Sequence, residues 1–138
     1  MEKAVNLLQK AIDAGETIAI ASDFDVDGIF SSMVLHTAFQ RVGAKCFVET
    51  PNRVTEGYGL NRRIVDDSLQ KGAKLLITCD NGIAALDAVQ YAKDKGLTVI
   101  VTDHHEVPFE EQEDGSRNFV KPVADAIVNP KQKECQYP

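Results

Sequence analysis

The chain has 138 residues, of which 43% are hydrophobic and 26% are charged, and its formal net charge is −6. This length predicts one domain with its own core, and the composition is typical of a soluble globular protein rather than a disordered one. The negative charge argues against a general electrostatic grip on nucleic acid, unless several of the acids are metal ligands.

No apolar run is long enough to span a bilayer, and the N-terminus lacks the hydrophobic stretch of a signal peptide. The three cysteines, Cys46, Cys79 and Cys135, are far apart and form no CxxC pair. Their spacing argues against a disulfide framework and against structural zinc. We therefore expect no contact with a membrane and a reducing, cytoplasmic location.

Apolar segments alternate with amphipathic segments along the chain, and glycine or proline separates many of them. The predicted helices are residues 2–14, 29–42, 61–71 and 83–95. The predicted strands are residues 17–21, 44–50, 74–78, 97–102 and 124–128. Residues 52–60 are a predicted loop, and residues 108–122 are a predicted exposed loop or insertion. Continuous apolar strands that alternate with helices predict an α/β fold, a doubly wound and mostly parallel sheet with helices on both faces.

The first predicted strand leads into residues 22–28, where Asp23, Asp25 and Asp27 alternate with two apolar residues. In an extended chain this alternation places the three carboxylates on one side. Carboxylates this close repel one another unless a proton or a cation lies between them, so we expect a divalent metal site. The same pattern opens an EF-hand calcium loop. However, that loop needs an acid at its twelfth position, which is Val34 here, and a helix before it.

Two more predicted strands end in polar residues. Asp80 follows the third strand, and Asp103, His104 and His105 follow the fourth. Ligands gather at the carboxyl ends of strands in parallel sheets, so these residues should meet the acidic turn. Asp80 could instead be a helix cap, which would need no metal. Because adjacent side chains diverge, we expect one histidine at the metal and the other at the substrate, with Asp103 orienting a ring.

Carboxylate and imidazole ligands without thiolate favour manganese or magnesium, or iron or cobalt, over structural zinc. Two such ions would suit phosphoester hydrolysis. Cys79 has no histidine at a protease-like spacing, and we assign it to strand packing. Arg53 could pair with a substrate phosphate and Tyr58 could stack on a base. For Arg62 and Arg63 a solvated helix face is the favoured interpretation.

Three motifs resemble the first three motifs of the DHH phosphoesterases. They are Asp23-Phe24-Asp25-Val26-Asp27-Gly28, Thr78-Cys79-Asp80-Asn81-Gly82 and Thr102-Asp103-His104-His105-Glu106. Three further stretches are similar to the RecJ branch, whose members are single-strand-specific 5′-to-3′ DNA exonucleases of recombination and repair. They are Pro51-Asn52-Arg53, Glu56-Gly57-Tyr58-Gly59-Leu60 and Asn129-Pro130-Lys131. The resemblance covers essentially the whole chain.

The resemblance implies a DHH-type catalytic domain that uses Mn²⁺ or Mg²⁺, with two ions in the complete site. The implied metal ligands are Asp25, Asp27, Asp80 and His104, with Asp80 between the two ions and Asp23 as a further ligand or an outer acid. His105 would contact the scissile phosphate, and Asp103 would support the histidines. Arg53 and Tyr58 would bind single-stranded DNA.

The sequence departs from the family pattern at two points. Ala21 stands where many members of the superfamily carry a metal-binding histidine. The fourth motif, with another ligand aspartate, and the accessory domain would lie beyond residues 1–138. The resemblance therefore implies the N-terminal part of a catalytic core that works with the remaining domains of a longer protein and is inactive alone.

Two other interpretations stay open. Within enzymes, the chain could come from a DHH phosphodiesterase for short oligonucleotides or cyclic dinucleotides, or from a pyrophosphatase. Outside enzymes, it could be a metal-free scaffold with the same fold. Mutually repelling carboxylates argue against the scaffold, because a scaffold has no need of them.

Overall fold

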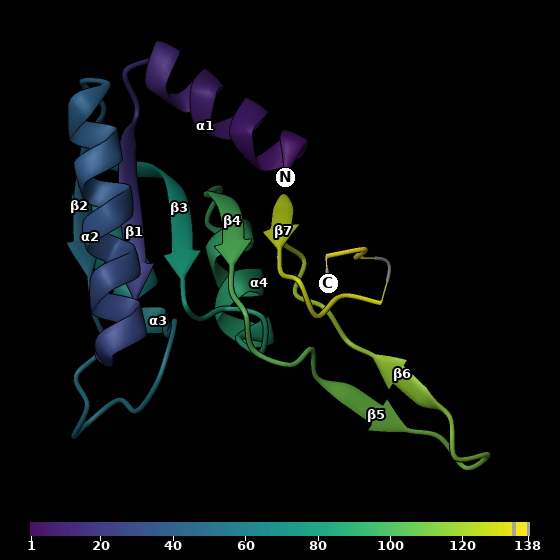
Figure 1. Cartoon of the computed structure of the whole chain (residues 1–138). Coiled ribbons are helices and arrows are strands. Elements are labelled where there is room, and N and C mark those ends of the chain that lie inside the picture. The colour runs from purple at the N-terminus through teal and green to yellow at the C-terminus, as the bar shows by residue number, and fades with distance from the viewer. Residues whose placement is uncertain (134, 138) are drawn as a thin grey trace.

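The computed structural model describes residues 1–133 and 135–137 (Figure 1). In this part of the chain the helices are α1 (Glu2–Asp13), α2 (Val26–Arg41), α3 (Arg62–Gln70) and α4 (Leu86–Asp94). The strands of the main sheet are β1 (Thr17–Ser22), β2 (Lys45–Glu49), β3 (Ala73–Cys79), β4 (Thr98–Thr102) and β7 (Ala126–Val128). None of the described helices is long and apolar enough to cross a membrane.

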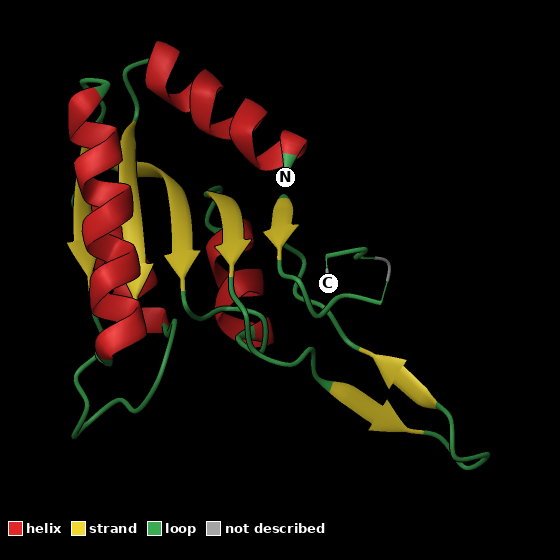
Figure 2. Ribbon diagram, viewed as in Figure 1, coloured by secondary structure: helices red, strands yellow, loops and turns green. Residues whose placement is uncertain are grey.

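The main sheet is parallel throughout and has the strand order β2-β1-β3-β4-β7 (Figure 2). Successive side chains of its strands enter different cores. In β1, Ile18 and Ile20 pack with Ala11 of α1 and Phe39 of α2, whereas Ala19 packs on the opposite face with residues of α3 and α4. Helices therefore cover both faces, and the predicted doubly wound sheet is confirmed.

Helix α2 begins at Val26, three residues before its predicted start. Asp25 is its N-cap, and the Asp25 carboxylate accepts a 2.9 Å hydrogen bond from the Gly28 N–H. This contact ends the extended conformation at Asp25. Asp27 consequently lies in the first helical turn, so the strand-like alternation expected for the three aspartates does not reach it.

Residues 108–122 were predicted to be an exposed loop, and they contain the antiparallel strands β5 (Phe109–Glu111) and β6 (Arg117–Phe119). Figure 2 shows this hairpin projecting away from the main sheet. The Phe109 and Phe119 rings lie 6.0 Å apart, and the Arg117 guanidinium lies 4.3 Å from the Phe109 ring centre. The exposure was predicted correctly, but the strands were not.

Cys46, Cys79 and Cys135 are free thiols. Cys79 is the last residue of β3 and is buried in the core beneath α1 and α2. Burial raises the pKa of its thiol to about 11, so it is neutral at pH 7. This confirms the packing role expected for Cys79.

Candidate metal centre

The polar turns that follow β1, β3 and β4 meet at the carboxyl edge of the sheet. One cleft, of about 560 Å³, is lined by Asp27, Asp80, Asp103 and His104 among others. A second cleft, of about 330 Å³, is lined by residues that include Asp23, Asp25, Asp80, Asp103 and His105. The two clefts share Asp80 and Asp103, so all seven predicted metal and catalytic residues line one connected site.

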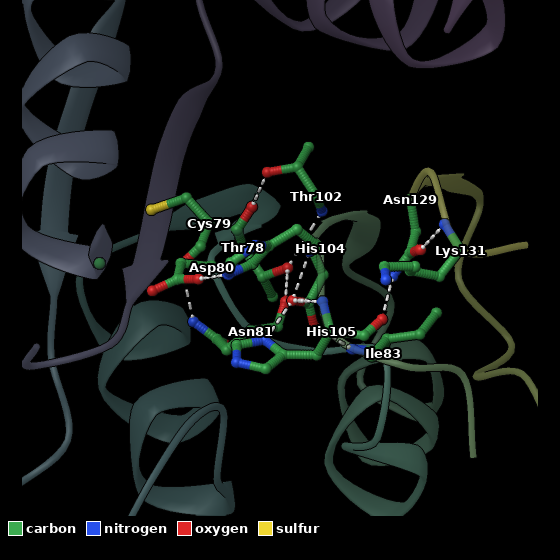
Figure 3. A network of polar contacts seen from close by, with 12 residues as sticks. Thr78, Cys79, Asp80, Asn81, Ile83, Thr102, His104, His105, Asn129 and Lys131 are labelled. Carbon is green, nitrogen blue, oxygen red and sulfur yellow. Dashed lines mark hydrogen bonds and ion pairs between the residues drawn. The ribbon is translucent and has the colours of Figure 1, made fainter. Parts of the chain in front are cut away.

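Asp80 lies at the centre of this site and has an unusual backbone conformation and side-chain environment (Figure 3). Its φ angle is +63°, which L-residues rarely adopt, and its side chain is only 6% exposed. Among the described residues, neither buried carboxylate oxygen has a hydrogen-bond partner, although His104 Nε2 lies 2.8 Å from Oδ1 at ion-pair distance. Burial and the neighbouring Asp25 carboxylate raise the pKa of Asp80.

Asp80 is not a helix cap. Helix α4 begins at Leu86 with Ala85 as its N-cap, and the Asp80 carboxylate bonds to no backbone amide there. The interpretation that needed no metal is therefore wrong. A buried, anionic group without hydrogen-bond donors is costly unless a cation accompanies it. Its carboxylate fits a divalent cation.

The two histidine rings lie against each other, with ring centres 4.7 Å apart. One nitrogen of each ring and one oxygen of Asp80 lie within 4.8 Å of one another. The expectation that the adjacent side chains diverge is therefore wrong, and both rings approach the same point. The donor set of carboxylate oxygen and imidazole nitrogen is the one that Mn²⁺ and related cations accept.

Asp103 holds the histidine pair in place through its carboxylate. Its Oδ1 lies 2.7 Å from His105 Nδ1 and accepts from the backbone N–H groups of His104 at 2.7 Å and His105 at 3.1 Å. Its Oδ2 accepts from the Ile83 N–H at 2.9 Å. The hydrogen bond with Asp103 raises the pKa of His105. Since His105 Nδ1 is engaged, its Nε2 is the nitrogen available to a ligand.

The carboxylates of Asp23 and Asp25 in the acidic turn lie in different environments. Asp23 is buried, its Oδ1 accepts from the Phe24 N–H at 2.7 Å, and burial raises its pKa. Asp25 is exposed, and the Gly28 N–H lowers its pKa. A Cβ on Gly28 would lie 2.5 Å from the Asp23 carbonyl oxygen. Glycine is therefore required there for the turn to close around the site.

Two asparagines, for which no site role was predicted, connect the turns of the site through hydrogen bonds. The Asn81 side chain donates to the carbonyl oxygens of Ala21 and Cys79, and accepts from the Leu60 N–H. The Asn129 amide donates to the His105 carbonyl oxygen at 2.9 Å. Both lie in stretches that carried the family resemblance, which is the only signal that pointed to them.

A stack of side chains lies beside the second cleft. The Phe24 and Tyr58 rings are 4.6 Å apart, and the Arg53 guanidinium lies 5.4 Å from the Phe24 ring centre. Tyr58, which lines that cleft, is 71% exposed. Phe24 is therefore an unpredicted partner of both Arg53 and Tyr58, whose contact with DNA stays a prediction.

Arg63 holds the loop that carries Arg53 and Tyr58. It donates to the Glu56 carboxylate, to the Thr50 carbonyl oxygen and to Asp67. The solvated-face interpretation is therefore wrong for Arg63.

Ala21, at the position where the resemblance implies a metal-binding histidine in many members, is fully buried in the sheet and offers no ligand atom.

Comparison with known proteins gives one family. Residues 17–136 match the sequence model described as the DHH family, N-terminal domain. Over its whole length the chain is 39% identical to the single-stranded-DNA-specific exonuclease RecJ of Haemophilus influenzae and 39% identical to that of Bacillus subtilis. The chain spans 22% and 16% of the length of these two relatives.

Solved structures agree with this match. A crystal structure of exonuclease RecJ bound to manganese superposes with a TM-score of 0.79 at 28% identity, over 96% of this chain and 31% of that one. A structure of RecJ from Thermus thermophilus in complex with Mn²⁺ gives a TM-score of 0.73 at 24% identity, over 98% of this chain and 18% of that one. At 24% identity, the match to the Thermus thermophilus structure shows only that the two chains share a fold.

Proposed function

The chain belongs to the DHH family, and from this membership and its site we propose that it is the N-terminal part of the catalytic domain of a RecJ-type exonuclease. The complete protein would degrade single-stranded DNA from its 5′ end in DNA repair and recombination. The relatives named RecJ, of which the chain spans 22% or less, support both parts of the proposal. We also infer a cytoplasmic location, where the DNA is and where free thiols persist.

The observation that carries the proposal is the Asp80 carboxylate, which is buried, lies close to both histidines and has no hydrogen-bond partner in the described part of the chain beyond its ion-pair contact with His104. The proposed ligands are Asp25, Asp27, Asp80 and His104, with Asp23 as a further ligand or an outer acid. Mn²⁺ or Mg²⁺ would occupy the site, as two ions in the complete protein. When bound, such ions polarise the phosphoryl group and lower the pKa of water, which is the chemistry that phosphodiester hydrolysis needs.

His105 is the proposed contact to the scissile phosphate. Its Nδ1 is held by Asp103, and this hydrogen bond raises the pKa of the ring, so the protonated ring can donate from Nε2 to a phosphate oxygen. Asp103 is then a positioning residue, since its carboxylate orients the ring and need not touch the substrate. Water adds to phosphorus while the bond from phosphorus to the 3′ oxygen breaks. The released mononucleotide keeps its 5′ phosphate, and the shortened strand gains a new one.

Arg53 and Tyr58 are the proposed DNA contacts. The exposed Tyr58 ring offers a face on which a base can stack, and Arg53 offers a charge for a phosphate. The Phe24 ring contacts both side chains. A chain of net charge −6 can bind DNA in this way, because Arg53 and the bound cations would neutralise the phosphates at the site itself.

One comparison tests the proposal. The 138-residue chain and the full-length protein are assayed on 5′-labelled single-stranded DNA, a dinucleotide and pyrophosphate, with and without Mn²⁺. Calorimetry measures Mn²⁺ binding by the wild type, by Asp80→Ala and by Glu113→Gln, an exposed acid on the β5–β6 hairpin. We expect the full-length protein to shorten only the DNA, the chain alone to be inactive, and Mn²⁺ binding to be lost only in Asp80→Ala.

The other interpretations predict different results. Cleavage of the dinucleotide or of pyrophosphate alone would assign the protein to a small-substrate phosphoesterase. A full-length protein that is inert towards all three substrates, with Mn²⁺ binding unchanged in Asp80→Ala, would leave the scaffold interpretation and overturn ours.

A further inference from the structure

Helix α2 is apolar on the side that faces away from the sheet as well as on the side that packs against it. Its inner side contributes Phe39 and the partly buried Leu35 to the core. The exposed fractions on the outer side run from 47% to 68%, for Val26, Ile29, Phe30, Met33, Val34 and Val42 at the end of the helix. A contiguous apolar surface of this kind is unusual on a monomer and marks an interaction site.

This outer surface continues onto the sheet. A groove of about 590 Å³ runs past Phe30, Met33 and Val42, and Val34 lines both this groove and the 560 Å³ cleft at the carboxyl edge of the sheet. In Figure 1, α1 crosses the amino ends of the strands, and α2 lies over β1 and β2. The cleft lies between α2 and the carboxyl ends of β3, β4 and β7, which line it with Cys79, Thr102 and Val128.

We propose that this α2 surface, defined by Ile29, Phe30, Met33, Val34 and Val42, is the docking site of an apolar helix from the same polypeptide. The proposal rests on the proposed function only in taking the chain as the N-terminal part of a longer protein. The RecJ relatives supply ample chain for such a helix, since the matched region spans 22% or less of them. The exposed side chains recur at intervals of three and four residues, which is the spacing of ridges that accept a second helix.

Charge argues against a second copy of the chain as the occupant. A net charge of −6 on each copy disfavours such pairing, and a parallel arrangement would in addition bring together the acidic sites beside Asp27 and Asp80, where the α2 surface ends. It also argues against nucleic acid, because Arg41 is the one cation that lines the groove among the described residues. An apolar helix meets neither obstacle.

The two methionines of the chain provide an internal test. Met33 lies on the α2 surface and is 57% exposed, whereas Met1 lies at the N-terminus of α1 and is 79% exposed. Oxidation by hydrogen peroxide is followed at each by mass spectrometry, in the 138-residue chain and in the full-length protein. We expect similar rates at both methionines in the chain, and a rate at Met33 that is about tenfold slower in the full-length protein with Met1 unchanged.

Equal oxidation of both methionines in the full-length protein would overturn the proposal. Protection of Met33 in the isolated chain that grows with protein concentration would assign the surface to a second copy instead. These readouts do not depend on nuclease activity or Mn²⁺, so their failure differs from failure of the proposed function.

A substitution gives a second measurement. Phe30→Glu should lower the melting midpoint of the full-length protein by several degrees and leave that of the 138-residue chain nearly unchanged, because the side chain is 62% exposed there. Val54→Glu, at a loop position that is 91% exposed, is the matched control and should change neither protein. An equal decrease for Phe30→Glu in both proteins would contradict the proposed docking site.

Discussion

Replacing Asp80 by asparagine should stabilise the protein without metal and weaken the protein with metal. A raised pKa means that the folded state holds the proton more tightly than the unfolded chain does. Burial and the Asp25 carboxylate raise the pKa of Asp80, so its ionisation weakens the fold at neutral pH. Asparagine keeps the shape, tolerates the φ of +63° and carries no charge.

The size of the effect follows from the contacts of Asp80. A buried polar group without a partner costs about 1–3 kcal/mol when it is neutral and more when it is charged, and asparagine keeps only the neutral part of this cost. The His104 ring at 2.8 Å offsets part of this cost, so we expect Asp80→Asn to gain about 1–2 kcal/mol. For a domain of this size, that gain raises the melting temperature by roughly 3–7 °C. Mn²⁺ at a hundred times its Kd would stabilise the wild type by about 2.7 kcal/mol, which exceeds the gain.

The assay is a thermal melt of wild type and Asp80→Asn, each in a chelator and in excess Mn²⁺. We expect the variant to melt higher in the chelator and the wild type to melt higher in Mn²⁺. Glu113→Gln removes one exposed charge from the hairpin and should change neither order. A lower melting temperature of Asp80→Asn in the chelator would refute the reasoning. An equal response of both proteins to Mn²⁺ would refute the role of Asp80 as a ligand.

Three further predictions concern the two turns around the site and one ion pair at the opposite edge of the sheet. Arg63→Ala should cost about 1 kcal/mol in urea unfolding, since the half-exposed guanidinium ties the loop before α3 to that helix; no loss would mean that solvent replaces its contacts. Gly28→Ala should cost roughly 2–4 kcal/mol by the same method, because its Cβ would meet the Asp23 carbonyl oxygen at 2.5 Å; a neutral result would contradict the closed turn. Burial raises the pKa of Asp125, but bonds from Lys93 and a backbone amide outweigh it, and the net shift is downward. Its stabilising contribution is therefore complete above about pH 4 and is lost as the pH falls through the lower folded pKa. In Asp125→Asn, the free energy of unfolding should consequently decrease less steeply as the pH is lowered below about 4.

The layered sheet could be predicted because strand and helix patterns are local. Each strand is a continuous apolar run, and each run ends at a polar turn, which is enough to place the turns at one edge. The start of α2 could not be read in this way. Alternating Asp-x-Asp-x-Asp is typical of an extended chain, but the hydrogen bond from Gly28 to Asp25 converts its second half into a helix. The three-residue spacing of the N-cap contact between Asp25 and Gly28 is present in the sequence, but the alternation of the aspartates is the stronger signal.

The hairpin at 109–119 was missed for a related reason. Its strands have three residues each, and the segment is charged, so apolar alternation is weak. The one local signal is the Asp114-Gly115 pair, with a φ of +79° at the glycine, which is typical of a tight turn between strands. Arg63 was misread because its partner Glu56 belongs to another element, and pairing between elements has no sequence period.

The site residues could be named from the sequence, but their relation to one another could not. Adjacent histidines normally point apart, yet His104 and His105 lie with ring centres 4.7 Å apart because Asp103 binds both backbone amides and one ring. That arrangement needs a buried carboxylate two strands away from the acidic turn. It also needs Asp80 to adopt a positive φ, a conformation that no residue pattern announces.

The strained Asp80 and the apolar α2 surface have one physical consequence in common. Each is unfavourable for the isolated 138 residues, the first by crowding charge and the second by exposing side chains such as Phe30 to water. A cation would remove the first cost and a covering helix the second, and Val34 joins the two regions along one groove and cleft. Binding of the helix would also exclude water from one side of Asp80, which strengthens its attraction for a cation. We therefore expect Mn²⁺ to bind more weakly to the 138-residue chain than to the full-length protein, and calorimetry on the two proteins would measure the difference.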